Sequence, residues 1–340
     1  MLDSSLWLLI IIILLAIGFG MSNGLNDAAN AIATVVGTRV LSPRNALIMA
    51  AVANLAGAAT GTAVAKTIGK GILVPEAISY LTVIAALSAI IVWAVLATYY
   101  GLPISLTHGF VAAMAAAGFA VAGAGAVNWA VMNRVLSAVV SAPVLGFLAG
   151  FIVMIGLYWL LRRAAPARVR GIFSVLQIFS AAFMAYSHGK NDGQMPIGII
   201  AMALVIYYNS LEQFTRAASV WEQIPWWVII VSAMAISAGT MIGGWRVIRT
   251  LGFRVTTLRP VHGFAAEASG AAVIEVASHL GIPVSTTHCI SSAIMGVGAT
   301  KRLSAVRWGV AGNIVTAWII TFPICGGLGY LFALILKMVV

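Results

Sequence analysis

Long apolar runs separated by short polar interruptions fill the whole chain. A helix needs about 20 apolar residues to cross a bilayer, and ten segments come close to that length when two interrupted ones are included. The pattern predicts an all-α integral membrane protein with about five spans in each half, namely 6–38 (interrupted), 45–65, 78–100, 103–122 and 134–161, then 171–208 (interrupted), 226–245, 262–280, 283–299 and 308–337.

Basic residues mark the ends of these runs and orient them. With the N-terminus outside, thirteen Lys and Arg residues fall in inside loops and five in outside loops, the bias of the positive-inside rule. We therefore expect a multi-pass plasma membrane protein with both termini extracytoplasmic. An odd number of spans per half inverts the second half. The predicted parts are a repeat over 1–161, a basic cytoplasmic linker over 162–170 and an inverted repeat over 171–340.

Composition excludes several classes of protein. Charged residues make up 8% of the 340 residues, against about 25% in soluble domains, and hydrophobic residues make up 62%. A soluble enzyme of this size could not bury so much apolar surface. The formal net charge is +11, but the basic residues separate apolar runs and form no face or tail, so a nucleic-acid partner is not expected. The lipid bilayer is the expected environment.

Two motifs occur once in each half. Gly24-Leu25-Asn26-Asp27 in the first half recurs as Gly189–Asp192 in the second, and Gly101-Leu102-Pro103 with Ser105, Thr107 and His108 recurs as Gly281–His288. Gly- or Pro-interrupted apolar segments at matching positions of two halves indicate a secondary transporter. We expect two inverted-topology repeats, with broken helices or re-entrant hairpins that meet near the midplane.

The residue types in these motifs suit ion binding. An ionised Asp at membrane depth costs roughly 2.5–3.5 kcal/mol, so it needs a cavity or a partner. A helix interrupted at the Gly before Asn-Asp would expose carbonyl oxygens that coordinate a cation. In the second motif, Pro begins a helix whose free N–H groups and hydroxyls would bind an anion. Together the motifs predict one compact oxyanion beside the Asp residues, either with cations between them or with a protonated anion that donates to a carboxylate.

The Asn-Asp motifs, the Gly281–His288 stretch and Gly263–Glu267 resemble the signatures of the inorganic phosphate transporter (PiT) family, in particular its bacterial low-affinity permeases. The resemblance implies uptake of inorganic phosphate by symport with Na⁺ or H⁺, by alternating access around a central site. It implies no enzyme activity and no cofactor besides the coupling ion. Phosphate as a bare anion or a metal complex, and a monomer or a homodimer, are all compatible with it.

The resemblance also implies roles for individual residues. Phosphate would be bound by Asp27, Ser105, Thr107, Asp192, Ser285, Thr286 and Thr287. The coupling ion, Na⁺ if a metal, would be held by Asn26, Asp27, Asn30, Asn191, Asp192 and Gln194. Coupling or gating roles fall to Glu267, His108 and His288. Leu106 replaces a Thr of the family pattern, and Met195 replaces an Asn for which Gln194 would substitute.

Each role has a plainer alternative. The two Asp residues could stabilise helix breaks, and the hydroxyls could cap helices after Pro. The two His residues could orient their half-helices or relay protons, and Glu267 could be a structural partner. At the level of the whole protein, the alternatives are a sulfate or other oxyanion permease of the same fold, an intramembrane hydrolase and a channel. The duplicated parts disfavour the hydrolase, which needs a single nucleophile.

Overall fold

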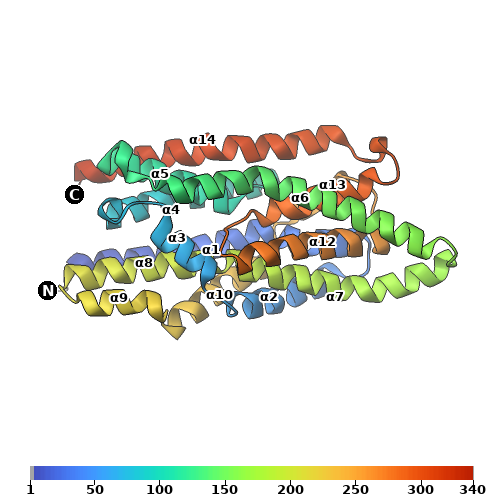
Figure 1. Cartoon of the computed structure of the whole chain (residues 1–340), viewed down its shortest axis with the longest axis horizontal. Coiled ribbons are helices and arrows are strands. Elements are labelled where there is room, and N and C mark those ends of the chain that lie inside the picture. Colours follow the sequence, from blue (N-terminus) through green and yellow to red (C-terminus); the bar gives the residue numbers. More distant parts are fainter. Residues whose placement is uncertain (1–3, 340) are drawn as a thin grey trace.

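The computed structural model describes residues 4–339, which fold almost entirely into α-helices. These residues contain no β-sheet, only an isolated bridge between Leu73 and Val127. The helices run roughly along one long axis, with the start of α1 and the end of α14 at the same end of the molecule (Figure 1). Among residues 4–339, five helices are long and apolar enough to cross a membrane, or up to seven if each of two bent pairs is one span. The predicted all-α membrane architecture is confirmed.

The described part of the first half contains six helices and ends at the basic connection between the halves. These are α1 (Ser4–Gly37), α2 (Pro43–Ala58), α3 (Ala63–Gly71), α4 (Tyr80–Tyr100), α5 (Leu106–Ala122) and α6 (Trp129–Leu161), with short 3₁₀ turns η1 (Pro75–Ala77) and η2 (Ala124–Ala126). The helices α2 and α3 are bent by 69° at their break. The α6 helix passes through Pro143 without ending.

The second half begins at the opposite end of the long axis from the first, so α7 and α8 run against α1 (Figure 1). Its elements are α7 (Pro166–Asp192), α8 (Gln194–Ser210), α9 (Phe214–Glu222), α10 (Trp226–Ile242), α11 (Trp245–Arg249), the π-turn η3 (Thr250–Arg254), α12 (Pro260–His279), α13 (Thr286–Ala299), the 3₁₀ turn η4 (Leu303–Ala305) and α14 (Trp308–Val339). Since α7 begins at Pro166, the non-helical connection is shorter than the predicted linker 162–170.

The helical hairpins that the second motif predicts are present. The helices α4 and α5 form one hairpin, and α12 and α13 form the other. In each hairpin the chain reverses at a Gly in the left-handed region, Gly101 (φ 73°) in the first and Gly281 (φ 68°) in the second. Segments 103–122 and 283–299 were expected as full spans, and that prediction was wrong. The second arms α5 and α13 have only 17 and 14 residues, fewer than the roughly 20 that a crossing needs.

The predicted interruption at the Asn-Asp motifs is also wrong. The α1 helix is continuous through Asp27, and the second motif is followed only by Gly193, which keeps helical angles before α8 begins. The motif glycines serve close packing instead. A Cβ on Gly24 would lie 2.0 Å from the Ile236 carbonyl oxygen of α10, and one on Gly189 would lie 2.2 Å from the Asn54 carbonyl oxygen of α2. The carbonyls in these helices are therefore not freed for a cation.

Both halves interlock through matching contacts. Helix α1 packs on α10 as α7 packs on α2, and the hairpin arms α5 and α13 pack on the long helices α14 and α6 of the opposite halves. Small residues permit this approach: a Cβ on Gly146 would lie 2.5 Å from the Cys289 carbonyl oxygen, and one on Gly329 would lie 2.5 Å from that of Ala113. Each hairpin is thus held by the other half.

A threonine holds each hairpin tip. The Thr250 hydroxyl donates to the Gly101 carbonyl oxygen at 3.1 Å, and the Thr67 hydroxyl donates to the Gly281 carbonyl oxygen at 2.8 Å. Thr250 lies in η3 of the second half and Thr67 lies in α3 of the first half, so each tip is bonded by the half that does not contain it. The two tips are therefore tethered in the same way on opposite halves.

Candidate functional site

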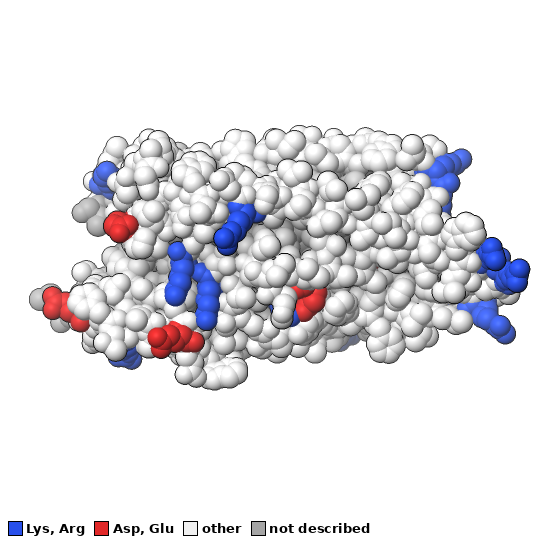
Figure 2. Space-filling model, in the orientation of Figure 1, with Lys and Arg blue, Asp and Glu red and all other residues white. Residues whose placement is uncertain are grey.

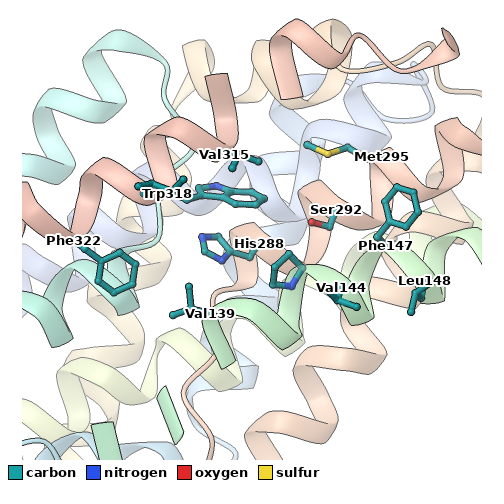
Figure 3. Close-up of a pocket in the computed structure, with 12 residues that line it drawn as sticks. Val139, Val144, Phe147, Leu148, His288, Ser292, Met295, Val315, Trp318 and Phe322 are labelled. Atoms are coloured by element: carbon teal, nitrogen blue, oxygen red, sulfur yellow. The ribbon is translucent and has the colours of Figure 1, made fainter. Parts of the chain in front are cut away.

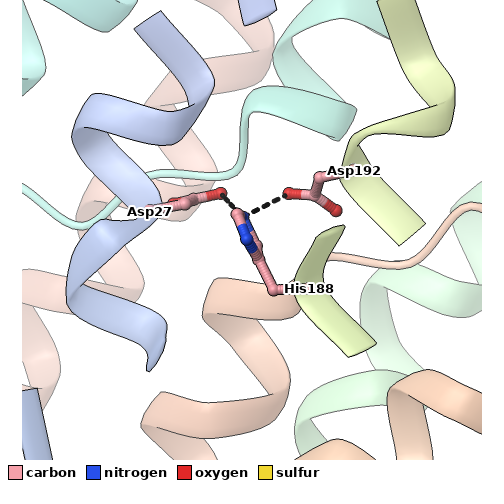
Figure 4. A group of neighbouring side chains, drawn as sticks. All are labelled: Asp27, His188 and Asp192. Atoms are coloured by element: carbon pink, nitrogen blue, oxygen red, sulfur yellow. Dashed lines mark ion pairs between the residues drawn. The ribbon is translucent and has the colours of Figure 1, made fainter. Parts of the chain in front are cut away.

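Two carboxylates and one imidazole meet between the central helices α1 and α7 (Figure 4). Asp27 of α1 and Asp192 of α7 face each other across His188, whose Nε2 lies 3.8 Å from Asp27 Oδ2 and 3.4 Å from Asp192 Oδ2. The potential ligand atoms of these three residues lie within 4.8 Å of one another, close enough to share one metal ion. The repeated Asn-Asp motif thus forms one site from both halves.

The imidazole of His188 is held in its orientation by Asn54 of α2. Its Nδ1 lies 2.8 Å from Asn54 Oδ1, and Asn54 Nδ2 donates to the Thr240 hydroxyl at 2.8 Å. Because the Asn54 oxygen is an acceptor in this network, we assign the Nδ1 hydrogen to His188. Nε2 can then donate to the carboxylates only when it also carries a proton. The two carboxylates can therefore be neutralised either by a proton on His188 or by a cation between them.

The N-terminal turn of α13 supplies hydroxyls to both carboxylates. Thr287 donates to Asp27 Oδ1 at 2.9 Å, and Thr286 donates to Asp192 Oδ2 at 3.2 Å. Asn30, one turn after Asp27, donates to the Thr286 hydroxyl at 3.1 Å and to the Thr287 hydroxyl at 3.0 Å. These predicted residues therefore form one connected cluster, in which each hydroxyl has a carboxylate as its acceptor.

Both serines of the second motif cap their helices. The backbone N–H of His108 donates to Ser105 Oγ at 3.2 Å, and that of His288 donates to Ser285 Oγ at 3.1 Å. The alternative of N-capping therefore holds for both serines. It also fixes the first turns of α5 and α13, whose remaining N–H groups and positive dipole ends favour an anion.

The two motif asparagines attach the hairpins to the central helices. Asn26 donates to the Thr98 hydroxyl at 2.8 Å and to the Leu102 carbonyl at 3.2 Å. Asn191 donates to the Val284 carbonyl at 2.8 Å and to Asp192 at 2.5 Å, and it accepts from Ser278 at 3.3 Å. Thr98 and Ser278 occupy corresponding positions, each three residues before the Gly of its hairpin motif. These amides therefore position the tips beside the carboxylates.

Two predicted residues lie apart from the carboxylates. The Thr107 hydroxyl points to the sulfur of Met195 at 3.3 Å, in the place where the other half has Thr287 against Asn30. Gln194 is predicted on the cation side, and in this structure its Oε1 accepts from the N–H groups of Val64 and Ala65 at the start of α3. Its Nε2 donates to the Lys190 carbonyl. Gln194 thus joins the start of α3 to the end of α7.

The imidazoles of His108 and His288 pack where the two hairpins meet. Their ring centroids are 4.9 Å apart in an edge-to-face arrangement, and Trp318 covers His288 at 4.0 Å. An apolar cavity of about 660 Å³ lies beside them between α6, α13 and α14 (Figure 3). Val144 and Ile319 on its wall are 50% and 65% exposed, so the cavity faces the lipid side and is unsuited to an anion.

The central site is closed to solvent. Each of its residues is at most 2% exposed, a group that comprises Asn26, Asp27, Asn30, Ser105, Thr107, His188, Asn191, Asp192, Ser285, Thr286 and Thr287. Two buried amide oxygens, Asn26 Oδ1 and Asn30 Oδ1, accept no hydrogen bond from the residues the structure describes. Carboxylate and amide oxygens buried together in this way are suited to a hard cation.

Each half of the chain matches the same known protein family. Residues 23–171 and 161–329 each match the phosphate transporter family. The chain belongs to the phosphate transporter family. Each match contains one Asn-Asp motif and one hairpin. This membership confirms the family resemblance, and it confirms that the transporter is not an enzyme.

Individual relatives cover the whole transporter. It is 41% identical to the probable low-affinity inorganic phosphate transporter of Bacillus subtilis over 99% of both chains. It is 42% identical to the protein of the same name from Rhizobium meliloti over 93% of this chain and 92% of the relative. A solved structure, the sodium-dependent phosphate transporter, is 27% identical and superposes with a TM-score of 0.88, covering 98% of this chain and 100% of that one.

Sequence reasoning gave His188 and Asn54 no role. His188 was part of the repeated motif, but the aligned position in the first half is Asn23, so the repeat offered no paired histidine. Asn54 is a lone amide in an apolar run. A buried amide within such a run is a usable signal, because an unsatisfied polar group is costly in the membrane.

Glu267 lies in a separate polar cluster between α1, α7 and α12. Its carboxylate accepts from the Thr34 hydroxyl at 2.5 Å, from Gln177 Nε2 at 3.0 Å and from the Ser180 hydroxyl. Thr38 donates in turn to Gln177 Oε1 at 2.8 Å. The carboxylate therefore joins both central helices to the second hairpin.

Replacing Glu267 with Gln is expected to lower the free energy of unfolding by about 2 kcal/mol, because the NH₂ group that replaces one carboxylate oxygen cannot accept and leaves at least one of the three donors without its acceptor. Thermal unfolding of the purified protein in detergent measures this loss. Glu275→Gln is the matched control on the same helix: that carboxylate pairs with Lys190 at a partly exposed position, and its loss should cost at most about 1 kcal/mol. Equal losses in the two variants would contradict a special role for the cluster.

Proposed function

We propose that the transporter imports inorganic phosphate together with Na⁺, by alternating access around the Asp27–Asp192 site. The observation that carries the proposal is the sealed cluster in which both carboxylates face hydroxyls of a hairpin tip. Similarity to a sodium-dependent phosphate transporter supports Na⁺ as the coupling ion.

In the proposed cycle, Na⁺ binds first beside the two carboxylates. Asp27 supplies charge, and the unpaired oxygens of Asn26 and Asn30 on the same helix supply neutral ligands. Asp192 is the charged ligand from the other half. Neutralising both carboxylates removes the repulsion that would otherwise exclude an anion, so cation binding precedes phosphate binding.

Phosphate then binds between the cations and the hairpin tips. Thr286 and Thr287 donate to carboxylates in this structure, and their hydroxyls can turn to donate to phosphate once Na⁺ has taken those carboxylate oxygens. The N–H groups of the first turns of α5 and α13 add further donors. Ser105 and Ser285 hold these turns in place and supply hydroxyls at the same helix starts.

Phosphate is favoured over sulfate by the two carboxylates. At neutral pH phosphate carries a proton that it can donate to Asp27 or Asp192, whereas sulfate can only accept. Sulfate would therefore meet any carboxylate oxygen that Na⁺ does not bind without a proton to donate, and such a contact between two acceptors is costly in a buried site.

The distribution of charged side chains supports one orientation of the protein in the membrane. On the visible face, only Lys and Arg side chains appear at the end that holds the connection between the halves, while Asp and Glu appear toward the other end and near the middle (Figure 2). The positive-inside rule assigns the first end to the cytoplasm. Both chain ends then lie outside, and import runs from that side through the plasma membrane.

Radiolabelled phosphate uptake into proteoliposomes tests the proposal. An inward Na⁺ gradient is expected to drive uptake that excess sulfate does not inhibit, and a pH gradient alone is expected to drive little. Uptake driven by the pH gradient alone would assign the coupling role to a proton. His188, which lies between the carboxylates, would then be the proton acceptor. Strong inhibition by sulfate, or no uptake of phosphate under either gradient, would overturn the substrate assignment.

A further inference from the structure

A small cavity of about 290 Å³ lies beside the second hairpin tip. It is formed by α3, the start of α6 and the tip itself, and it is lined by Lys66, Thr67, Lys70, Gly71, Val131, Arg134, Val135, Leu280, Gly281, Ile282 and Pro283. This cavity is separate from the carboxylate site and from the apolar cavity beside His288.

Three cations and no carboxylate line this cavity. Lys66, Lys70 and Arg134 are exposed, and none of them forms an ion pair with a residue the structure describes. Figure 2 shows Lys and Arg side chains gathered over the region of α3 on the visible face. Lys190, by contrast, is neutralised by Glu275. The cavity therefore carries an uncompensated positive charge in a protein with few charges.

The cavity floor is the hairpin tip that covers the phosphate site. Thr67 on the wall donates to the Gly281 carbonyl oxygen, and Pro283 on the floor lies two residues before Ser285. The next residue, Thr286, already contacts Asp192. An anion in this cavity would be separated from the central site only by the tip.

A basic residue accompanies the tether of the other tip too. Arg249 precedes Thr250 as Lys66 precedes Thr67, and Thr250 bonds the first tip. Arg246, one turn earlier, stacks on Tyr99 at 4.5 Å, next to the first tip. Basic side chains thus accompany the tip tethers of both halves, which a role in topology alone would not require.

We propose that this cavity is an outer vestibule that binds inorganic phosphate before the hairpin tip moves. The inference rests on the proposed function, since it assigns the vestibule to the same substrate. Three positive charges in a concave surface raise the local concentration of a small oxyanion. Because the side chains are exposed, salt screens this attraction over about 8–10 Å at physiological ionic strength.

Removing the three charges together tests the vestibule by kinetics. In proteoliposomes with a fixed Na⁺ gradient, Lys66→Gln/Lys70→Gln/Arg134→Gln is expected to raise the half-saturating phosphate concentration about five-fold at low ionic strength, with the maximal rate retained. The difference should shrink at high ionic strength. Arg216→Gln is the control, because Arg216 lies on α9 outside the cavity. An unchanged half-saturating concentration in the triple variant would overturn the proposal.

Thiol labelling tests occupancy without transport. Leu280 lines the cavity and is 66% exposed, whereas the native Cys289 and Cys325 are fully buried. Inorganic phosphate is expected to slow the reaction of Leu280→Cys with a membrane-impermeant methanethiosulfonate, and the triple variant should abolish that protection. Protection should persist when Asp27→Asn is added, because the vestibule does not need the central site. Labelling that phosphate leaves unchanged would overturn the vestibule even where Na⁺-driven uptake supports the proposed function.

Discussion

Replacing Asp27 with Asn is expected to lower Na⁺-driven phosphate uptake by about 100-fold or more, since removing one charge from a buried ionic cluster costs about 3–5 kcal/mol. The amide keeps a carbonyl oxygen that can accept from Thr287, so the packing of α1 on α13 is retained. It cannot neutralise Na⁺. Uptake measured in proteoliposomes, together with the yield of monodisperse protein, separates loss of function from loss of fold.

Two further variants control the Asp27 result. Asp192→Asn should cause a similar loss, because the two carboxylates come from matching positions of the two halves and share His188. Glu76→Gln makes the same chemical change at an exposed position in η1 and should leave uptake unchanged. Normal uptake by Asp27→Asn would remove that carboxylate from the site.

The central site was predictable because its residues recur. Two motifs, each present once per half and in the same order, placed Asp27, Asp192 and the threonines of the second hairpin in one site, and the structure brings them into contact. The same repeat predicted two hairpins, because Gly and Pro after an apolar run end a helix. The two motifs that recur in the sequence thus correspond to two matching hairpins and two matching central helices in the structure.

Features outside the repeat were missed or misjudged. Met195 and Gln194 break the pattern of the first half, and the sequence could not tell that Gln194 would bind the start of α3, far away along the chain. Hydropathy could not tell re-entrant arms from spans, since both are apolar and differ only in length and depth. Glycine in the Asn-Asp motif fitted both a helix break and a close contact, and only the position of the partner helix decides between them.

The close contact of Gly189 with the Asn54 backbone predicts the second large effect of a substitution. Replacing Gly189 with Ala is expected to destabilise the protein by about 3 kcal/mol, the upper part of the range for overpacking. The added Cβ would lie 2.2 Å from the Asn54 carbonyl oxygen and 2.6 Å from the Asn54 Cα, and these backbone atoms cannot move by a rotamer change. Helices α2 and α7 must then separate.

Separation of these helices also removes the support of His188, because Asn54 is the residue that holds its Nδ1. Gly189→Ala should therefore lose phosphate uptake as well as thermal stability in detergent. Gly156→Ala in α6 is the matched control: its Cβ would meet nothing within 4 Å, and alanine favours a helix over glycine by about 1 kcal/mol. The control should be neutral or stabilising. Wild-type stability and uptake in Gly189→Ala would mean that α2 does not approach α7 this closely, and that His188 is oriented by something other than Asn54.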